Sequence, residues 1–390
     1  KATQTLRQLV PLIVSYHNFV STSSLEVVKR RLLRVPADAY KIVTTARRPS
    51  DNLRVIEFAR KGLDSTPLVV FAMSEVGVAT RILAPSLGSA YTYAAPENAT
   101  GTAPGQISSR LMRDLYRCEK LTRHSKIYGV IADPVSHSKS PFLHNRAFQS
   151  RRIDAVYLPF LVAPARLPEW MQMAAALPVA GFSVTIPHKQ RIVRHLDVVE
   201  PLARRIGAVN TVWRKAGKWR GTNTDTDGVL KPLSQRVQLS KASVLIVGYG
   251  GAARAAAIAL CDAGARVTIT GRNAQNAKLL ARAIRAESIA IDDSMQGHFD
   301  VLLHCTPVGM APQPDKTLFP DKIPADVVFD MVYNPHETAL LKRAASQGRT
   351  VIHGSEMLLA QAARQFEIWT GESAPLNVMI KAFELNTSSS

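Results

Sequence analysis

Residues 243–254 read SVLIVGYGGAAR, and this stretch decides the fold class of the chain. Its first six residues predict a buried strand, and an alanine-rich helix is expected to follow to about residue 263. The turn between them has the pattern G-x-G-x-x-A in the strand–turn–helix context of a dinucleotide site. Gly248 permits the tight turn, Gly250 lets backbone approach a pyrophosphate, and Ala253 allows close helix–strand packing. A tight turn without a ligand is the alternative.

The next strand, ARVTIT (265–270), indicates which dinucleotide binds. It ends at Gly271, Arg272 and Asn273. A carboxylate at this place is typical of NAD sites, because it binds the ribose 2′-hydroxyl. Arg272 suits a 2′-phosphate instead, since a guanidinium can bind it through two hydrogen bonds. The sequence therefore predicts NADP as cofactor, with a solvated surface arginine as the alternative.

Strands and helices alternate along the rest of the chain, which predicts an α/β fold with parallel sheets. Residues 1–120 contain four apolar runs, each followed by polar or helical spacing, at 11–16, 40–45, 67–73 and 89–94. Four βα units are half of a (β/α)8 barrel and would leave an open edge. Because the chain begins at Lys1 and not at Met, we expect further barrel residues upstream.

The predicted domains are 1–120, a partial barrel; 126–240, a second α/β region; 241–355, a Rossmann domain; and 356–390, C-terminal helices with a polar tail.

Composition narrows the function classes. The net charge of +19 would suit a nucleic-acid partner, but the basic residues are spread along the chain and not interleaved with aromatic residues. We therefore expect no nucleic-acid partner. We attribute the charge to a proteome that is basic in general, or to a basic cleft for anionic ligands. No apolar run could span a bilayer and no leader pattern is present, so the expected location is the cytoplasm, without a membrane partner. Three scattered cysteines argue against a disulfide framework and a zinc site.

Four polar segments of the second region carry chemistry: SHSKSP (136–141), SVTIPHK (183–189), GAVNT (207–211) and GTNTD (221–225). Hydroxyls and free backbone donors before a helix that starts near Pro141 suit a carboxylate ligand, although an ordinary helix cap has the same composition. Lys189 and Asp225, each taken alone, are more often solvated charges than catalysts.

Together with GYGGAAR (248–254), CTPVGM (305–310), FDMVYNP (329–335) and MLLAQAA (357–363), these segments follow one another as in shikimate dehydrogenases, which residues 126–386 resemble. The resemblance implies a substrate domain, a Rossmann NADP domain and C-terminal helices that return to the substrate domain. It also implies the reversible reduction of 3-dehydroshikimate to shikimate in aromatic amino acid biosynthesis.

The resemblance assigns roles to individual residues. The catalytic pair would be Lys189 and Asp225. The substrate-binding residues would be Ser138 and Ser140 for the carboxylate, Thr185, Asn210 and Gln361 for ring hydroxyls, and Tyr333 nearby. The cofactor-binding residues would be Gly248, Gly250, Gly251, Ala252, Ala253, Arg272, Asn273, Met331 and Gly354. Two departures stand out: Gly271, where many relatives have Asn, and His304-Cys305, where Asn and a small residue are usual.

The implied chemistry has a simple physical basis. An ammonium within hydrogen-bonding reach of the developing alkoxide stabilises its charge and can deliver a proton. Asp225 beside Lys189 would orient the amine and favour its charged form. The formal proton donor of the two stays open.

Residues 1–120 resemble the C-terminal half of a type I 3-dehydroquinate dehydratase, as in bifunctional plant enzymes. The matching segments are SYHNF (15–19), YKI (40–42), 74–81, GS (88–89) and TAPGQ (102–106). By this resemblance Lys41 forms a Schiff base with the substrate and His17 moves the proton. Arg81 would bind the substrate carboxylate, and Thr102 and Gln106 would lie on a closing loop.

Two other functions remain open at this point. A quinate dehydrogenase of the same fold would have to fit an extra hydroxyl near Ser183 and Thr185. A silent regulator that binds the same metabolites is disfavoured, because both candidate catalytic residues are present. The expected partners are small-molecule substrates, with a second copy of the chain left open.

Overall fold

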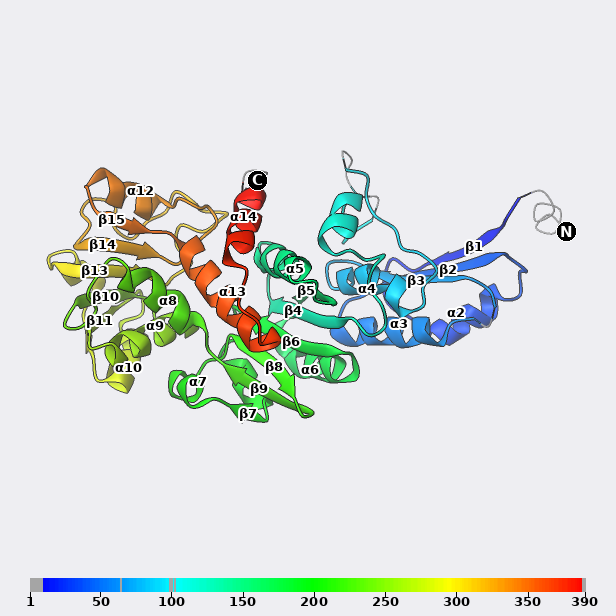
Figure 1. Cartoon of the computed structure of the whole chain (residues 1–390), viewed down its shortest axis with the longest axis horizontal. Coiled ribbons are helices and arrows are strands. Elements are labelled where there is room, and N and C mark those ends of the chain that lie inside the picture. Colours follow the sequence, from blue (N-terminus) through cyan, green and yellow to red (C-terminus); the bar gives the residue numbers. More distant parts are fainter. Residues whose placement is uncertain (1–9, 64, 98–100, 102, 388–390) are drawn as a thin grey trace. The chain divides into compact units, whose positions relative to one another are not determined.

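The computed structural model describes residues 10–63, 65–97, 101 and 103–387. It forms two compact units that meet in the chain between His188 and Lys189, and each is described by itself. This two-part division does not test the four predicted domains, which stay a prediction. Figure 1 labels the helices and strands.

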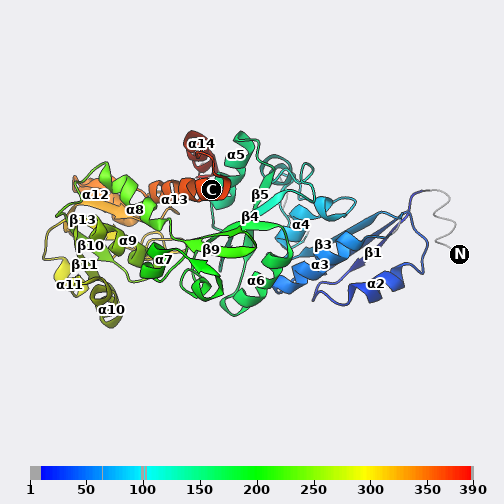
Figure 2. The ribbon, with the colours of Figure 1, turned by 60° about the horizontal axis from the view of Figure 1, so that its bottom comes forward.

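A small parallel sheet of three strands begins the first unit. The strands are β1 (Ile13–His17), β2 (Ala39–Thr45) and β3 (Leu68–Met73), in the order β1-β2-β3. Every residue of β3 is buried, as expected for a strand covered on both faces. The helices of this part are α2 (Leu25–Leu32), α3 (Pro49–Lys61), α4 (Val78–Leu83) and the turns η1 (Pro85–Leu87) and η2 (Leu111–Leu115). Figure 2 shows α2 and α3 beside the strands.

The fourth strand predicted at 89–94 does not form, so the half-barrel has three strands in the described residues rather than four. Ala90 donates one backbone hydrogen bond to Leu68 at 2.8 Å. Next to this bond, the Val70 N–H donates to the Ser89 hydroxyl and not to a backbone carbonyl. The same hydroxyl donates to the Tyr91 carbonyl. These local bonds compete with a sheet ladder, so the segment stays irregular.

The second part of this unit has strands β4 (Lys126–Ala132), β5 (Ala155–Leu161) and β6 (Val179–Val184), with β4 paired in parallel to both others. Its helices are α5 (Ser140–Ser150), α6 (Leu167–Ala176) and the short turn η3 (Pro164–Arg166). The Ser50 N–H at the start of α3 donates to the Glu169 carboxylate of α6 at 3.0 Å. This bond joins the two parts of the unit.

The second unit begins with turn η4 (Arg191–His195), strands β7 (Val198–Val199), β8 (Thr211–Lys215) and β9 (Lys218–Thr222), and helices α7 (Pro201–Ile206) and α8 (Asp225–Ser234). Its main sheet holds β10 (Ser243–Val247), β11 (Arg266–Thr270), β12 (Glu287–Ser288), β13 (Phe299–His304), β14 (Ala325–Asp330) and β15 (Thr350–Ile352). The remaining helices are α9 (Gly251–Asp262), α10 (Ala274–Ile284), α11 (Ile291–Ser294), α12 (Ala339–Ser346), α13 (Gly354–Thr370) and α14 (Leu376–Thr387).

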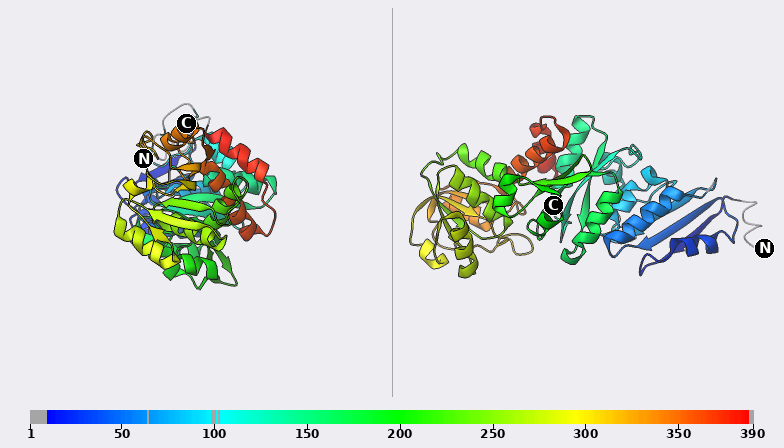
Figure 3. Two further views of the ribbon diagram at one scale, coloured as in Figure 1. Left: turned by 90° about the vertical axis from the view of Figure 1, so that its left-hand side faces the viewer. Right: turned by 90° about the horizontal axis from the view of Figure 1, so that it is seen from below.

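The main sheet has the Rossmann order. The strands run β12-β11-β10-β13-β14-β15, all parallel, with the order reversing beside β10. Val244 and Ile246 pack against α8, α9 and α10, whereas Leu245 and Val247 pack against the layer of α12. Alternate residues of one strand thus serve two cores, which explains its continuous apolar run. Figure 3 shows this unit, in green to orange, with helices on both sides of the sheet.

Other sequence predictions concern absences. Among the helices that the structure describes, none is long and apolar enough to cross a membrane. The described residues contain no group of three His, Cys, Asp or Glu placed to hold a metal ion, and Cys118, Cys261 and Cys305 are free thiols.

Candidate active site

A β-hairpin brings together two of the predicted polar segments. Strands β8 and β9 are antiparallel, and the turn between them has left-handed φ angles at Ala216 (50°) and Gly217 (76°). Two such residues in succession make the turn that matches the twist of paired strands. At the open end of the hairpin Thr211 lies opposite Thr222. Asn210, which precedes β8, therefore lies next to the residues that follow β9.

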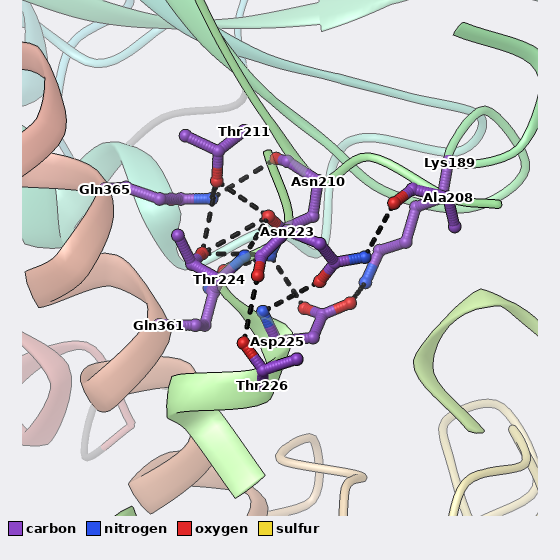
Figure 4. A network of polar contacts seen from close by, with 10 residues as sticks. All are labelled: Lys189, Ala208, Asn210, Thr211, Asn223, Thr224, Asp225, Thr226, Gln361 and Gln365. Carbon is purple, nitrogen blue, oxygen red and sulfur yellow. Dashed lines mark hydrogen bonds and ion pairs between the residues drawn. The ribbon is translucent and has the colours of Figure 1, made fainter. Parts of the chain in front are cut away.

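Asp225 is the centre of the resulting polar network (Figure 4). Its side chain is 3% exposed, and its Oδ1 accepts from Asn210 Nδ2 at 2.8 Å. Its backbone N–H donates to Asn223 Oδ1 at 3.0 Å. The same Asn210 amide reaches Gln361 Oε1, at 3.2 Å, on α13. Asn210 thus holds one oxygen of the carboxylate, and Asn223 holds the Asp225 backbone.

Lys189 completes this network. Its Nζ donates to Asp225 Oδ2 at a distance of 2.5 Å, and the lysine side chain is 15% exposed. The Lys189 carbonyl accepts the Val209 N–H at 2.8 Å, which ties the lysine backbone to the segment before β8. A buried carboxylate with one ammonium and one amide donor holds that ammonium in a fixed direction.

Three supporting residues were not predicted. Thr224 and Thr211 bond to Asn210 Oδ1, at 2.8 Å through the Thr224 N–H and at 2.7 Å through the Thr211 hydroxyl. Gln365, one helical turn after Gln361, donates to Thr211 Oγ1 at 3.1 Å. The spacing of two glutamines at i and i+4 on one helix was a signal that could have found Gln365, because such residues share a face.

The glycine turn lies beside this pair. Gly248 has φ +127°, which an L side chain rarely adopts, and a Cβ on it would lie 3.0 Å from the Cys305 carbonyl oxygen. Gly250 has no atom within 4 Å of its added Cβ, so the backbone is open there. A Cβ on Gly251 would lie 3.3 Å from Lys189 Cβ. The open turn at the start of α9, with Ala252 and the buried Ala253 behind it, fits a dinucleotide pyrophosphate.

Arg272 is exposed and follows β11 after Gly271. This is the position at which the sequence predicts a contact to a 2′-phosphate. Asn273 caps α10, its Oδ1 accepting the Asn276 N–H at 3.0 Å. The unusual Gly271 has a local cause, because an added Cβ would lie 3.0 Å from the ring of Tyr249. The tyrosine of the glycine turn thus occupies the room that a side chain at 271 would need.

The structure places other predicted residues as follows. Ser138 and Ser140 lie at the start of α5, where Ser140 N–H donates to Ser138 Oγ at 3.4 Å. Thr185 follows β6, and its N–H bonds the Ile131 carbonyl of the neighbouring β4 at 3.2 Å. The two serines follow β4 after a loop, and Thr185 directly follows β6. Ligands in α/β folds bind beyond the carboxyl ends of parallel strands. These three residues belong to the first unit and the network of Lys189 to the second.

Three residues lie at the carboxyl edge of the Rossmann sheet. Met331 packs on the sheet core, and its N–H donates to the His304 carbonyl at 3.0 Å. Burial raises the pKa of Tyr333. Gly354 begins α13, and a Cβ there would lie 2.4 Å from the Val332 carbonyl oxygen. Close packing alone therefore requires a glycine at 354.

The N-terminal sheet brings Lys41 and His17 to one face. Ser15 pairs with Lys41 and His17 with Val43, so both side chains project from the same side of neighbouring strands. Burial lowers the pKa of Lys41, Tyr91 opposes this shift, and Arg81 adds to it. Burial, and then Lys41, lowers the pKa of His17.

Arg81 faces the same group of residues. It is 2% exposed, and burial lowers its pKa to about 10. One nitrogen donates to the Tyr93 carbonyl at 3.1 Å, and the Lys41 ammonium lies 3.8 Å from the Tyr93 ring centre. Among the described residues, Arg81 Nε and Nη2 have no hydrogen-bond partner. A buried guanidinium with free donors suits a carboxylate ligand.

Two further loop residues were predicted here. Gln106 lies in the described part of its loop, beside Gly101. Thr102 lies outside the described residues.

The Rossmann strand order, the open glycine turn and an ammonium–carboxylate pair beside it define a class, the nucleotide-dependent oxidoreductases. Comparisons with known families narrow this class. Residues 130–212 match the family described as "Shikimate dehydrogenase substrate binding domain", and 232–307 match "Shikimate / quinate 5-dehydrogenase". Residues 354–382 match "Shikimate 5'-dehydrogenase C-terminal domain", and 1–123 match "Type I 3-dehydroquinase".

Individual relatives and solved structures point to the same families. The chain is 39% identical to a shikimate dehydrogenase (NADP(+)) of Desulforamulus reducens, over 67% of this chain and 95% of that protein. It is 36% identical over 93% of its length to a chloroplastic bifunctional 3-dehydroquinate dehydratase/shikimate dehydrogenase of Arabidopsis thaliana, of which it spans 64%. A crystal structure of a shikimate dehydrogenase with NADP+ gives a TM-score of 0.65 at 35% identity, covering 68% of this chain and 97% of the other. The Thermus thermophilus enzyme with NADP(H) and shikimate gives 0.60 at 33% identity, covering 67% and 99%.

The chain therefore belongs to the shikimate dehydrogenase family, with a partial type I dehydroquinase segment before it, as in the bifunctional members.

Proposed function

We propose that this chain reduces 3-dehydroshikimate to shikimate with NADPH, reversibly. The observation that carries the proposal is the Lys189–Asp225 pair at 2.5 Å, packed beside the glycine turn through Gly251. NADPH supplies the hydride when it is bound. Lys189 stabilises the charge that develops on the substrate oxygen and, with Asp225, manages the proton that this oxygen gains. Asn210 and Gln361 are proposed to bind ring hydroxyls, and Ser138, Ser140 and Thr185 keep their implied substrate roles.

An NADPH oxidation assay with 3-dehydroshikimate and 3-dehydroquinate in parallel tests the proposal. A shikimate dehydrogenase oxidises NADPH with the first ketone, and a quinate dehydrogenase also with the second. Binding of both ketones without oxidation would identify a silent metabolite binder and overturn the proposal.

Arg272 is proposed to bind the 2′-phosphate of NADP, which gives a first prediction. Arg272→Gln is expected to raise the KM for NADPH about 10- to 10²-fold, because hydrogen bonds to charged groups contribute about 1.5–3 kcal/mol. The KM for NADH, which has no 2′-phosphate, should stay within about twofold. Arg282→Gln, an exposed arginine on α10, is the matched control. Equal changes for both dinucleotides would assign Arg272 no part in the selection of NADP.

A second candidate function, 3-dehydroquinate dehydratase chemistry in the first unit, is favoured by the lowered pKa of Lys41 and the free nitrogens of Arg81. We propose that Lys41 forms the imine, that His17 moves the proton, and that Thr102 and Gln106 close over the substrate. For location we propose the cytoplasm, which fractionation of cells would test.

A further inference from the structure

His304, one of the two departures noted in the sequence, forms a buried chain of hydrogen bonds at the carboxyl edge of the Rossmann sheet. His304 ends β13 and pairs in register with Asp330, which ends β14. Their side chains are 3% and 0% exposed, and His304 Nδ1 lies 2.9 Å from Asp330 Oδ1. Asp330 also accepts the Val332 N–H at 3.0 Å and the Thr338 hydroxyl at 2.7 Å. Both oxygens of the carboxylate therefore have hydrogen-bond partners.

The Asp330 carboxylate decides which ring nitrogen of His304 donates to it. A carboxylate oxygen only accepts, so Nδ1 of His304 donates to Asp330, and in the tautomer that the inference uses Nε2 is the acceptor. The Thr306 hydroxyl lies 2.5 Å from Nε2, and with Nε2 as the acceptor it donates to the ring. The Thr306 oxygen also accepts the Val308 N–H at 3.2 Å. Its proton is therefore engaged, and the oxygen offers a remaining lone pair.

This oxygen lies on a residue that contacts the proposed cofactor site. A Cβ on Gly248 would lie 3.3 Å from Thr306 Cγ2, so Thr306 packs on the glycine turn. The intervening Cys305 lies within the electrostatic field of the catalytic pair. Burial raises the pKa of its thiol, Asp330 and Asp225 raise it further, and Lys189 opposes them. Thr306 thus packs on the pyrophosphate turn, and its neighbour Cys305 lies within electrostatic reach of the residues proposed to act on the reacting carbonyl.

We propose that His304, held by Asp330, is a positioning residue that presents the Thr306 oxygen as an acceptor to the nicotinamide half of bound NADP. The carboxamide amino group of nicotinamide is a donor and suits such an acceptor. The aspartate orients the imidazole, the imidazole accepts the hydrogen bond of the Thr306 hydroxyl, and the hydroxyl oxygen keeps a lone pair for the ligand. This inference rests on the proposed NADP-dependent function.

Dissociation constants of two ligands test it on the whole chain, without turnover. NADPH has the nicotinamide half, and adenosine 2′,5′-bisphosphate lacks it. Thr306→Val removes the hydroxyl and should weaken NADPH about 3- to 10-fold, the effect of one hydrogen bond. Binding of adenosine 2′,5′-bisphosphate should not change. Thr306→Ser should recover most of the lost affinity. Thr270→Val is the control, because that buried hydroxyl has no partner among the described residues.

A double-mutant cycle separates positioning from a structural role. His304→Asn keeps a donor for Asp330 but removes the imidazole acceptor, and should also weaken NADPH. If His304 acts through Thr306, the double variant with Thr306→Val is no weaker than Thr306→Val alone. Additive losses, or equal losses for both ligands, would overturn the positioning role. If the wild type bound neither ligand, the proposed function would itself fail. Thermal melting confirms that each variant is folded.

Discussion

Lys189→Ala is expected to lower the turnover number for 3-dehydroshikimate about 10²–10⁴-fold, the range for the loss of a general acid. In the proposed mechanism the ammonium stabilises the developing alkoxide and, with Asp225, supplies its proton. Asp225 holds it at 2.5 Å, and Asn210 fixes the other carboxylate oxygen at 2.8 Å. Alanine removes both the proton and the charge that stabilises the alkoxide. Steady-state kinetics on purified variant would measure the loss.

The fold should survive this change. Within the described residues Lys189 makes one side-chain hydrogen bond, to Asp225, and that carboxylate keeps its Asn210 partner. Lys278→Ala, an exposed lysine on α10, is the matched control and should retain full turnover. NADPH affinity and the melting temperature of Lys189→Ala show whether the site is intact. Near-normal turnover in folded variant would remove Lys189 from the mechanism.

The parts of the site that the sequence predicts best are held by short-range geometry. The glycine turn, the strand before it and α9 follow from about twenty residues around Gly248, and each has a local physical reason. The neighbourhood of Asp225 follows from the β8–β9 hairpin. The sequence indicates the segments 207–211 and 221–225 separately, and the hairpin explains why they meet.

Contacts distant in sequence could not be predicted in this way. Gln365 bonds to Thr211 from 154 residues away, and His304 bonds to Asp330, 26 residues away on the neighbouring strand. Periodicity gives the face on which a side chain lies but not the partner that it meets there. For the segment 89–94 the local pattern itself gives a wrong prediction. Its apolar pattern predicts a strand, but the Ser89 hydroxyl replaces the backbone ladder at its start.

The second large effect is expected in the N-terminal sheet, as a covalent adduct. Borohydride added together with 3-dehydroquinate should label Lys41. The neutral amine attacks the ketone, water leaves to give an imine, and borohydride reduces the C=N bond to a stable secondary amine. Burial lowers the pKa of Lys41, with Arg81 adding to the shift, so more of the amine is neutral near pH 7 than in an ordinary lysine. Mass spectrometry of the digested protein would locate the adduct.

The positions of Lys41 and Arg81 explain why the label should go to Lys41 and not to other lysines. Tyr93 contacts both groups, through its ring for Lys41 and its carbonyl for Arg81. A substrate carboxylate on the two free nitrogens of Arg81 would therefore hold the ketone within the neighbourhood of Lys41. Lys61, an exposed lysine on α3, is the internal control and should stay unlabelled. An adduct should be lost in Lys41→Ala and weakened in Arg81→Gln. Folded wild-type protein without label at Lys41, or with label spread over surface lysines, would show that three strands do not assemble a working imine site.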